Sequence, residues 1–246
     1  MEIRTFFTIN ELKDFSEPAE SLVIFDIFGA STMITSALQN GALRAVPIGN
    51  PEEGIKLRQI LGKDNVILCG KYHGAPLKEF DLNSSPALLG VSKPKDRLFA
   101  FLSPELTEAI EVSSQTPDIF LACFNNINAV AMNILGRDLI NIVCLGKGET
   151  MSLEDAVCAG MLIDLLLKDI PHERGLNDNS VTSRYLYNRH ENDIFGFLKE
   201  SNRGQELIAV NRRADLEYIA LINSSNVIPQ LAPDRTHFTV AGTLQL

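Results

Sequence analysis

LVIFDIFGASTMITSAL, residues 22–38, decides the fold class of this chain of 246 amino acids. Its first six residues are apolar except for Asp26, a pattern typical of a short buried β-strand. Ser31 or Thr32 can then cap a helix whose apolar side chains have helical spacing, and Gly41 is suited to end that helix. The stretch therefore predicts a strand followed directly by a helix.

The same alternation of strand and helix continues along most of the chain. It predicts a largely parallel or mixed central sheet that is covered on both faces by helices. We therefore expect a three-layer α/β/α fold and, because no linker or repeat interrupts it, a single domain over residues 1–246. Further strands are predicted at Ala45–Ile48, Val66–Cys69, Leu98–Leu102, Ile119–Phe124, Ile140–Cys144 and Val227–Ile228. Further helices are predicted from Pro51 to Gly62, over Ile127–Leu135, from Leu153 to about Leu167, within Pro171–Gly204 and over Ala214–Ile222.

The charge balance narrows the class of partner. Asp and Glu outnumber Lys and Arg by 31 to 22, which gives a formal net charge of −9. A nucleic acid would be repelled at long range, whereas a small anion needs only a few local cations or helix N-termini. We therefore expect no nucleic-acid partner and consider a small anionic ligand compatible with the composition.

Three further features concern the cellular location. No apolar run reaches the ~18 residues of a membrane span. The first fifteen residues, MEIRTFFTINELKDF, lack the continuous apolar segment of a signal peptide. The four cysteines lie far apart without a CxxC pair, which favours reduced, buried thiols. We expect a cytoplasmic protein with no membrane partner. The cysteines are Cys69, Cys123, Cys144 and Cys158.

Several polar residues follow predicted strands, at the edge of the sheet where open α/β folds bind their ligands. Asp26 ends the first strand, Asn126 follows a later one, and Glu154 lies in the first turn of a helix. Asp81 occupies a turn-rich loop. Together Asp26, Asp81 and Glu154 could hold Mg²⁺, which prefers carboxylate oxygens.

Each of these residues also has a structural interpretation. Asp26 can accept a hydrogen bond from a neighbouring backbone N–H, and Asp81 can simply form a turn. Ser152 and Asp155 have the spacing of a helix cap. The sequence alone leaves the structural and the functional interpretations open.

Family resemblance adds to this pattern. Five segments carry it, in the same order along the chain, and the last is the most distinctive. They are DIFGAST (26–32), FDLNSSP (80–86), FNN (124–126), CLG (144–146) and SLEDAVCAG (152–160). From about Leu22 to Pro229 the chain resembles the 2-phosphosulfolactate phosphatase family of coenzyme M biosynthesis.

The resemblance implies a magnesium-dependent phosphatase that acts on a small, strongly acidic phosphate ester. On this basis Asp26 and Asp81 are the expected catalytic carboxylates, as metal ligand or nucleophile. Glu154 is the third expected ligand of Mg²⁺. Ser31, Thr32 and Asn126 are expected to bind the substrate.

The chain departs from the family pattern at polar positions. Gly29 stands where the family has Arg, the natural bidentate clamp for phosphate or sulfonate. Residues 103–107, SPELT, replace a loop with a flexible Asn-Gly, and Asn83-Ser84 replaces Gly-Asn. Lys147 and Arg203 replace Thr and His, so we expect these two cations to restore positive charge for substrate binding.

Three hypotheses follow. The first is a Mg²⁺-dependent phosphatase that acts on a small anionic phosphorylated metabolite. The second is a catalytically degenerate homologue that binds a small anion without turnover, because the Arg is lost at Gly29. The third is a hydrolase that uses Cys123 or Cys144 as its nucleophile. A homodimer is expected only from the general statistics of oligomers.

Overall fold

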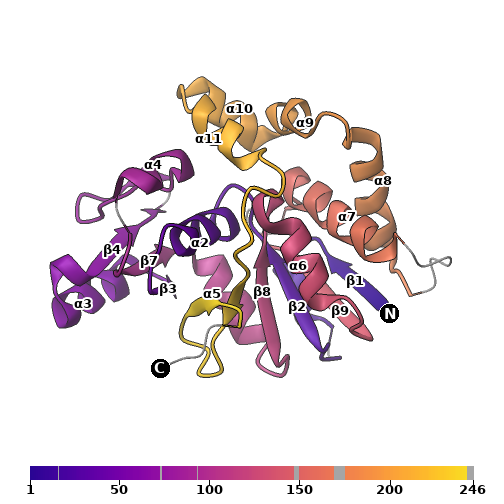
Figure 1. Ribbon diagram of the computed structural model, residues 1–246, viewed down its shortest axis with the longest axis horizontal. Helices are drawn as coiled ribbons and strands as arrows, with labels where there is room; N and C mark the ends of the chain where they lie inside the picture. The colour runs from indigo at the N-terminus through magenta and orange to yellow at the C-terminus, as the bar shows by residue number, and fades with distance from the viewer. Residues whose placement is uncertain (16, 73, 93, 147–149, 169–174, 243–246) are drawn as a thin grey trace.

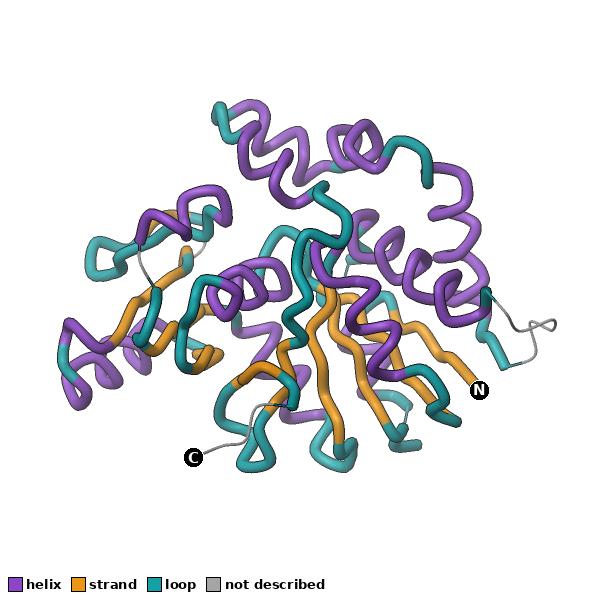
Figure 2. Tube along the Cα trace, in the orientation of Figure 1, coloured by secondary structure: helices purple, strands orange, loops and turns teal. Residues whose placement is uncertain are grey.

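A nine-stranded sheet runs through the computed structural model, with helices packed against it (Figures 1 and 2). Its strands form two parallel blocks that are joined by an antiparallel hairpin, so the sheet is mixed, in agreement with the prediction. The order across the sheet is β1 (Glu2–Phe6), β9 (Leu139–Cys144), β2 (Ser21–Phe25), β8 (Asp118–Ala122), β10 (Pro229–Leu231), β11 (Phe238–Val240), β3 (Arg44–Ile48), β7 (Leu98–Leu102) and β4 (Val66–Cys69).

Alternate side chains of β2 enter two different apolar cores, because successive residues of a strand point to opposite faces of the sheet. Val23 and Phe25 pack with α6 and α7, whereas Leu22 and Ile24 pack with residues of α1, α2 and α5. The three-layer α/β/α architecture is confirmed. These helices span Ile9–Lys13 (α1), Ala30–Gln39 (α2), Pro104–Val112 (α5), Ile127–Ile134 (α6) and Leu153–Leu167 (α7).

The other elements extend the two ends of the sheet. A second, two-stranded sheet follows β4, and a short helix α4 follows that sheet. Near the top of Figure 1, a run of short helices continues from α7. The remaining elements are α3 (Pro51–Leu61), β5 (Lys71–Tyr72), β6 (Ala75–Pro76), α4 (Pro86–Leu89), α8 (Asp178–His190), α9 (Ile194–Glu200), α10 (Asn202–Ala209), α11 (Arg213–Ile219) and the 3₁₀ turns Lys63–Asn65, Gly90–Ser92 and Phe124–Asn126.

The predicted helix cap at Ser31 or Thr32 is wrong. Helix α2 begins at Ala30, with Gly29 as its N-cap residue. The Ser31 and Thr32 hydroxyls lie inside the first turn and donate to the carbonyls of Ile24 and Ile27, at 3.0 and 2.7 Å. The hydroxyls therefore tie α2 to the end of β2.

Two other regions differ from the prediction. The last strand was predicted at Val227–Ile228, but it lies slightly further along the chain. Strand β10 begins at Pro229, the first residue of this segment that pairs with β11. The segment within Pro171–Gly204 contains α8, α9 and the start of α10, separated by short breaks. Strands β1 and β11 and helices α1 and α5 were not predicted. These elements are short, and their polar residues interrupt the regular spacing of apolar residues from which a strand or helix is predicted.

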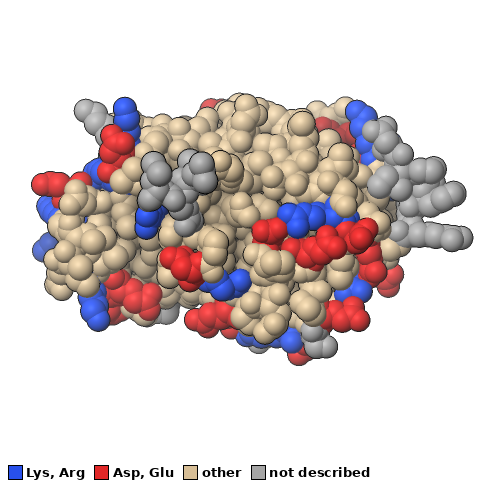
Figure 3. Space-filling model, turned by 60° about the horizontal axis from the view of Figure 1, so that its bottom comes forward, with Lys and Arg blue, Asp and Glu red and all other residues tan. Residues whose placement is uncertain are grey.

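The structure describes residues 1–15, 17–72, 74–92, 94–146, 150–168 and 175–242. Within these ranges, no helix combines the length and the apolar character that a bilayer span needs. Figure 3 shows one face of the surface, on which acidic and basic side chains alternate over a largely uncharged background. On this face the described residues form no continuous basic field of the kind that holds a nucleic-acid backbone.

Candidate active site at the carboxyl end of β2

Asp26 is the first residue after β2, and the chain folds back around its side chain. The backbone N–H groups of Gly29 and Ser31 both donate to the Asp26 carbonyl at 3.1 Å. Its carboxylate Oδ2 accepts the N–H of Ala30, the first residue of α2, at 2.6 Å. The carboxylate thus lies at the positive end of the α2 dipole, which favours its ionised form.

Gly29 makes this arrangement possible because it has no side chain. A Cβ atom at position 29 would lie 2.3 Å from Asp26 Oδ2 and 2.6 Å from Cγ, far inside van der Waals contact. The space that a larger residue would need is therefore filled by the Asp26 carboxylate. Any side chain at this position, including an arginine, would require Asp26 to adopt a different rotamer.

The first turn of α7 brings two more carboxylates to the loop after β2. Asp155 accepts the N–H of Ile27 at 2.8 Å and the N–H of Gly146 at 3.2 Å. It therefore connects the loop after β2 with the loop after β9, and Ser152 caps the helix as predicted. The neighbouring Glu154 is 9% exposed.

Burial raises the pKa of all three carboxylates, and neighbouring acids add to the shift at Asp26 and Asp155. Burial raises the pKa of Asp26 to about 6, and the charges of Glu105 and Glu154 act in the same direction. Burial also raises the pKa of Glu154, and that of Asp155 lies well above its ordinary value because of burial, Glu154 and Asp26. Uncompensated buried acids of this kind are typical of sites that bind a cation or move a proton.

Among the described residues, Arg203 is a cation whose charge acts on this site. It lies at the start of α10, and its charge lowers the pKa of both Asp26 and Glu154 against the larger effect of burial. Its Nη1 also forms an ion pair with Glu206 at 2.5 Å. The charge of Arg203, a predicted substrate-binding residue, therefore acts on two of the predicted site carboxylates, Asp26 and Glu154.

Glu105 is a site residue that sequence reasoning did not identify. The segment 103–107, expected as a loop, begins helix α5. Ser103 caps that helix by accepting the N–H of Leu106 at 3.2 Å, which places Glu105 in the first turn. The pattern Ser-Pro-Glu, a cap followed by a first-turn proline and acid, is the signal that could have predicted this helix.

Asp81, the second predicted catalytic carboxylate, is held elsewhere. It accepts the N–H of Leu68 in β4 at 2.9 Å and forms an ion pair with Arg58 of α3. Within the described parts of the chain, no three His, Cys, Asp or Glu side chains come close enough to hold a metal ion. The predicted magnesium site of Asp26, Asp81 and Glu154 is therefore not assembled, because Arg58 and β4 retain Asp81.

Three predicted substrate-binding side chains have structural roles instead. The buried hydroxyls of Ser31 and Thr32 bond backbone carbonyls, as described above. Asn126 is fully buried, its Oδ1 accepts the N–H of Cys123, and its Nδ2 donates to the carbonyls of Leu121 and Val227. None of these three side chains is available to a ligand. Lys147 was also predicted to bind the substrate, and it lies outside the described residues.

The cysteine hypothesis is wrong. Cys123 and Cys144 are both fully buried, and burial raises the pKa of each thiol. A nucleophilic thiol requires the opposite, a lowered pKa and access to the substrate. The cysteines are core residues.

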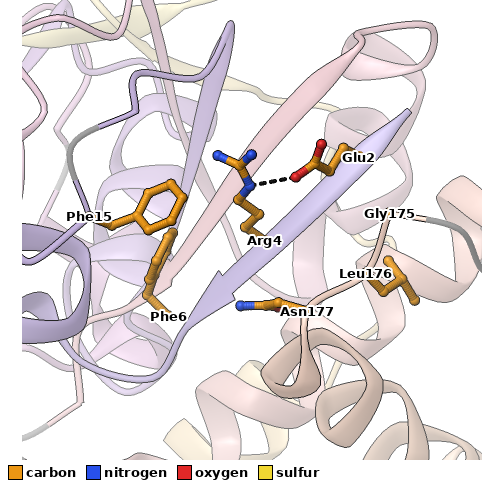
Figure 4. Close-up of a pocket in the computed structure, with 7 residues that line it drawn as sticks. All are labelled: Glu2, Arg4, Phe6, Phe15, Gly175, Leu176 and Asn177. Atoms are coloured by element: carbon orange, nitrogen blue, oxygen red, sulfur yellow. Dashed lines mark hydrogen bonds and ion pairs between the residues drawn. The ribbon is translucent and has the colours of Figure 1, made fainter.

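A cavity of about 250 Å³ lies beside the edge strand β1 (Figure 4). Its cation, Arg4, is paired with Glu2 at 2.6 Å and with Glu17 at 2.7 Å. The Asn177 side chain bonds the N–H and the carbonyl of Thr5, which holds the start of α8 against β1. The polar groups around this cavity are therefore already satisfied by the fold, and the carboxylates after β2 remain the candidate active site.

The site combines a partly exposed carboxylate of raised pKa, a second acid beside it, and an arginine. The N-termini of α2, α5, α7 and α10 contribute residues to the same place. Carboxylates hold a metal ion or accept a proton, while a guanidinium and helix N-termini bind an anion. Such a set is suited to the hydrolysis of a small anionic ester.

The comparisons with known proteins agree with this chemistry. The family model described as 2-phosphosulpholactate phosphatase matches residues 7–234. A relative from Caldicellulosiruptor saccharolyticus is 31% identical over 89% of this chain and 91% of its own. Relatives from Clostridium acetobutylicum and Caldanaerobacter subterraneus are 29% and 27% identical, each over 94% of this chain and over 97% and 95% of their own. All three carry the name probable 2-phosphosulfolactate phosphatase.

Proposed function

We propose a phosphatase function for this chain from the premise that it belongs to the 2-phosphosulfolactate phosphatase family. The proposed reaction is hydrolysis of the phosphate ester of a small, strongly acidic metabolite, 2-phosphosulfolactate or a close relative, in the cytoplasm. The observation that carries the proposal is the Asp26 carboxylate, held at the N-terminus of α2, whose pKa is raised to about 6 by burial and, to a smaller extent, by Glu105 and Glu154.

The protein's part in this reaction is mainly positioning and electrostatic stabilisation, as in phosphoryl transfer generally. The Arg203 guanidinium, next to Asp26 and Glu154, binds phosphate oxygens on which charge develops. In the overall reaction, water attacks phosphorus, the ester P–O bond breaks, and the alcohol leaves with a proton. Asp26 is the carboxylate on which this step depends.

The donor set fits Mg²⁺ at Asp26 and Glu154. Mg²⁺ in phosphate-processing sites is usually bound by one or two carboxylates together with substrate phosphates and water. The charge of Glu154 raises the pKa of Asp26, and a bound dication would offset that repulsion. The ion would supply Lewis-acid stabilisation of the phosphate. Asp81 is left out of this set because it is paired with Arg58.

The second candidate function is binding of the same anion without turnover. Gly29 supports it, because the Asp26 carboxylate fills the space beside Gly29 and accepts the N–H of Ala30 in α2 instead of contacting a ligand. For turnover, the Asp26 carboxylate must either contact the substrate or metal while it accepts the N–H of Ala30, or break that hydrogen bond and change rotamer.

The deciding experiment measures phosphate release from 2-phosphosulfolactate, phospholactate and p-nitrophenyl phosphate, with Mg²⁺ and with EDTA. We expect Mg²⁺-dependent turnover of at least one ester by the wild-type chain, and its loss in Asp26→Asn. The matched control is Asp64→Asn, the same chemical change on an exposed aspartate.

Folding of each variant is checked by circular dichroism before the assay. Turnover that persists in EDTA would contradict the metal, and full activity in Asp26→Asn would contradict the site. Binding of 2-phosphosulfolactate by calorimetry, with no phosphate released from any ester, would support the second candidate function instead.

A further inference from the structure

Three cations near the ends of helices and strands come from separate segments of the chain. Lys71 begins β5, just after β4, while Arg203 begins α10 and Arg212 directly precedes α11. A Cβ atom on Gly70 would lie 2.6 Å from the Cβ of Leu102, so the segment that leads to Lys71 lies against the end of β7, three residues before Glu105. Helices α10 and α11 contact each other, and α11 contacts α4. The proposed function above does not use Lys71 or Arg212.

The segment after β4 is fixed next to residues 82–84. Cys69 forms a β-bridge with Leu82, and the Gly70 N–H donates to the Leu82 carbonyl at 3.0 Å. Ser84, two residues further on, has a positive φ of 65° and turns its carbonyl toward Arg212, whose Nη2 donates to it at 2.7 Å. Residues 82–84 are therefore contacted by the backbone just before Lys71 and by the side chain of Arg212.

The guanidinium of Arg212 is positioned by a buried acid. Its Nε donates to Asp215 at 2.5 Å, and Asp215 also accepts the Ser85 hydroxyl at 2.5 Å and the Ala87 N–H at 3.1 Å. Asp215 is 3% exposed, so this network is rigid. Among the described residues, Nη1 of Arg212 has no hydrogen-bond partner.

Lys71 is the residue that the fold leaves uncompensated. It is only partly exposed, yet its ammonium makes no ion pair or hydrogen bond with any residue in the described ranges. Burial, Arg212 and Arg203 lower its pKa, while Asp215 and Glu206 oppose that shift less strongly. A partly buried cation beside two like charges is unfavourable unless an anion binds there.

Arg203 connects this group to the carboxylates after β2. Its charge acts on Asp26 and Glu154 and also on Lys71. A small molecule with two acidic groups can therefore place one group at Asp26 and Arg203 and the other at Lys71 and Arg212.

We propose that Lys71 and Arg212 bind the second acidic group of the substrate, the carboxylate or sulfonate that neighbours the phosphate ester. The proposal rests on the proposed function for the identity of the first group, the phosphate at Asp26 and Arg203. It makes Lys71 and Arg212 specificity-determining residues that select esters of a second acid over simple phosphate monoesters.

The test compares two esters in one variant. Lys71→Met removes the charge but keeps the aliphatic chain. We expect kcat/KM for 2-phosphosulfolactate or phospholactate to fall by about 10- to 100-fold, the usual loss for a charge-assisted hydrogen bond. We expect p-nitrophenyl phosphate, which has no second acidic group, to be hydrolysed at the wild-type rate. Lys78→Met, on a neighbouring exposed lysine, is the matched control.

Calorimetry with sulfolactate, which has no phosphate, makes the two proposals separable. If no ester is hydrolysed, weaker sulfolactate binding in Lys71→Met than in wild type would uphold the second-acid site while the phosphatase function fails. Equal loss of p-nitrophenyl phosphate hydrolysis and of 2-phosphosulfolactate hydrolysis would overturn the second-acid site. Sulfolactate binding that is unchanged by Lys71→Met would also overturn it.

Discussion

Asp26 directly follows the buried strand β2, and Asp81 lies beside the buried strand β4; their carboxylates accept a backbone N–H at 2.6 and 2.9 Å, respectively. Both lie in segments that resemble the same family. They differ in what surrounds the charge. Asp81 faces the guanidinium of Arg58, whereas Asp26 faces Glu105 and Glu154 and is only partly offset by Arg203.

The contrast separates a structural aspartate from a functional one by its charge environment. A carboxylate that is paired with an arginine of the same chain is already neutralised, so it binds a metal ion or a proton less strongly. A carboxylate that is crowded by other acids is held at a free-energy disadvantage until a cation or a proton arrives. Four predictions test this distinction, in order of decreasing effect.

The largest effect is expected from Asp26→Asn compared with Asp81→Asn. Loss of the Asp26 charge removes the group on which phosphate hydrolysis depends, and we expect kcat/KM to fall on the order of 10³-fold, as for loss of a central electrostatic group. Asp81→Asn is expected to change kcat/KM by less than about threefold, the range of an uncoupled substitution. Steady-state phosphate release measures both. Equal losses in the two variants would remove the distinction.

Gly29→Ala tests whether the rotamer of Asp26 matters. The new Cβ would meet the Asp26 carboxylate at 2.3 Å, so that side chain must leave the N–H of Ala30. We expect a loss of about 10- to 100-fold in kcat/KM, consistent with a displaced catalytic group. Gly90→Ala is the control, since its Cβ would meet nothing nearer than 3.6 Å. An unchanged or higher rate would show that the active rotamer points away from α2.

The pH dependence of the rate gives a smaller effect. Because the pKa of Asp26 is raised to about 6, kcat/KM of the free enzyme is expected to fall about tenfold per unit as the pH drops below 6. Glu105→Gln removes a charge that raises this pKa, so the midpoint moves to lower pH. A pH–rate profile between pH 4.5 and 8 measures the midpoint in both. A midpoint that stays in place would show that Asp26 does not titrate in the reaction.

The smallest effect concerns stability, and its sign should differ between the two aspartates. Asp81→Asn breaks the partly exposed pair with Arg58 and should lower the free energy of unfolding by about 1 kcal/mol. The raised pKa of Asp26 means that its ionised form destabilises the fold as the pH rises from about 4 through 6. Asp26→Asn should therefore be more stable than wild type at pH 7, with the advantage disappearing near pH 4. Urea unfolding at the two pH values tests the sign, and a less stable Asp26→Asn at pH 7 would contradict it.

The parts of the fold that depend on local pattern could be predicted from the sequence. β4, β7 and α7 begin and end at the predicted residues, because each is a strongly apolar run bounded by polar or cap residues. The position of Asp26 directly after a strand was predicted for the same reason. β1 was not predicted, since its five residues include Glu2 and Arg4.

The roles of individual polar side chains depend on tertiary contacts and could not be predicted in the same way. Whether Ser31 and Asn126 face a ligand or a buried carbonyl depends on chain segments that the sequence does not place. Asp81 was assigned to the metal because nothing in the sequence pairs it with Arg58, 23 residues earlier. Arg203 was predicted from a substituted position, and its charge lowers the pKa of Asp26 against the larger effect of burial.

The hairpin of β10 and β11 has a consequence for folding kinetics. Within the described sheet, this hairpin alone connects β8 to β3. Residues 229–240 therefore join two blocks of strands that are both synthesised before them. Until that segment leaves the ribosome, each block carries an unpaired edge strand, which is a site for aggregation. Because the missing contacts join residues far apart in sequence, we expect slow final assembly of the sheet and a need for chaperone protection before it.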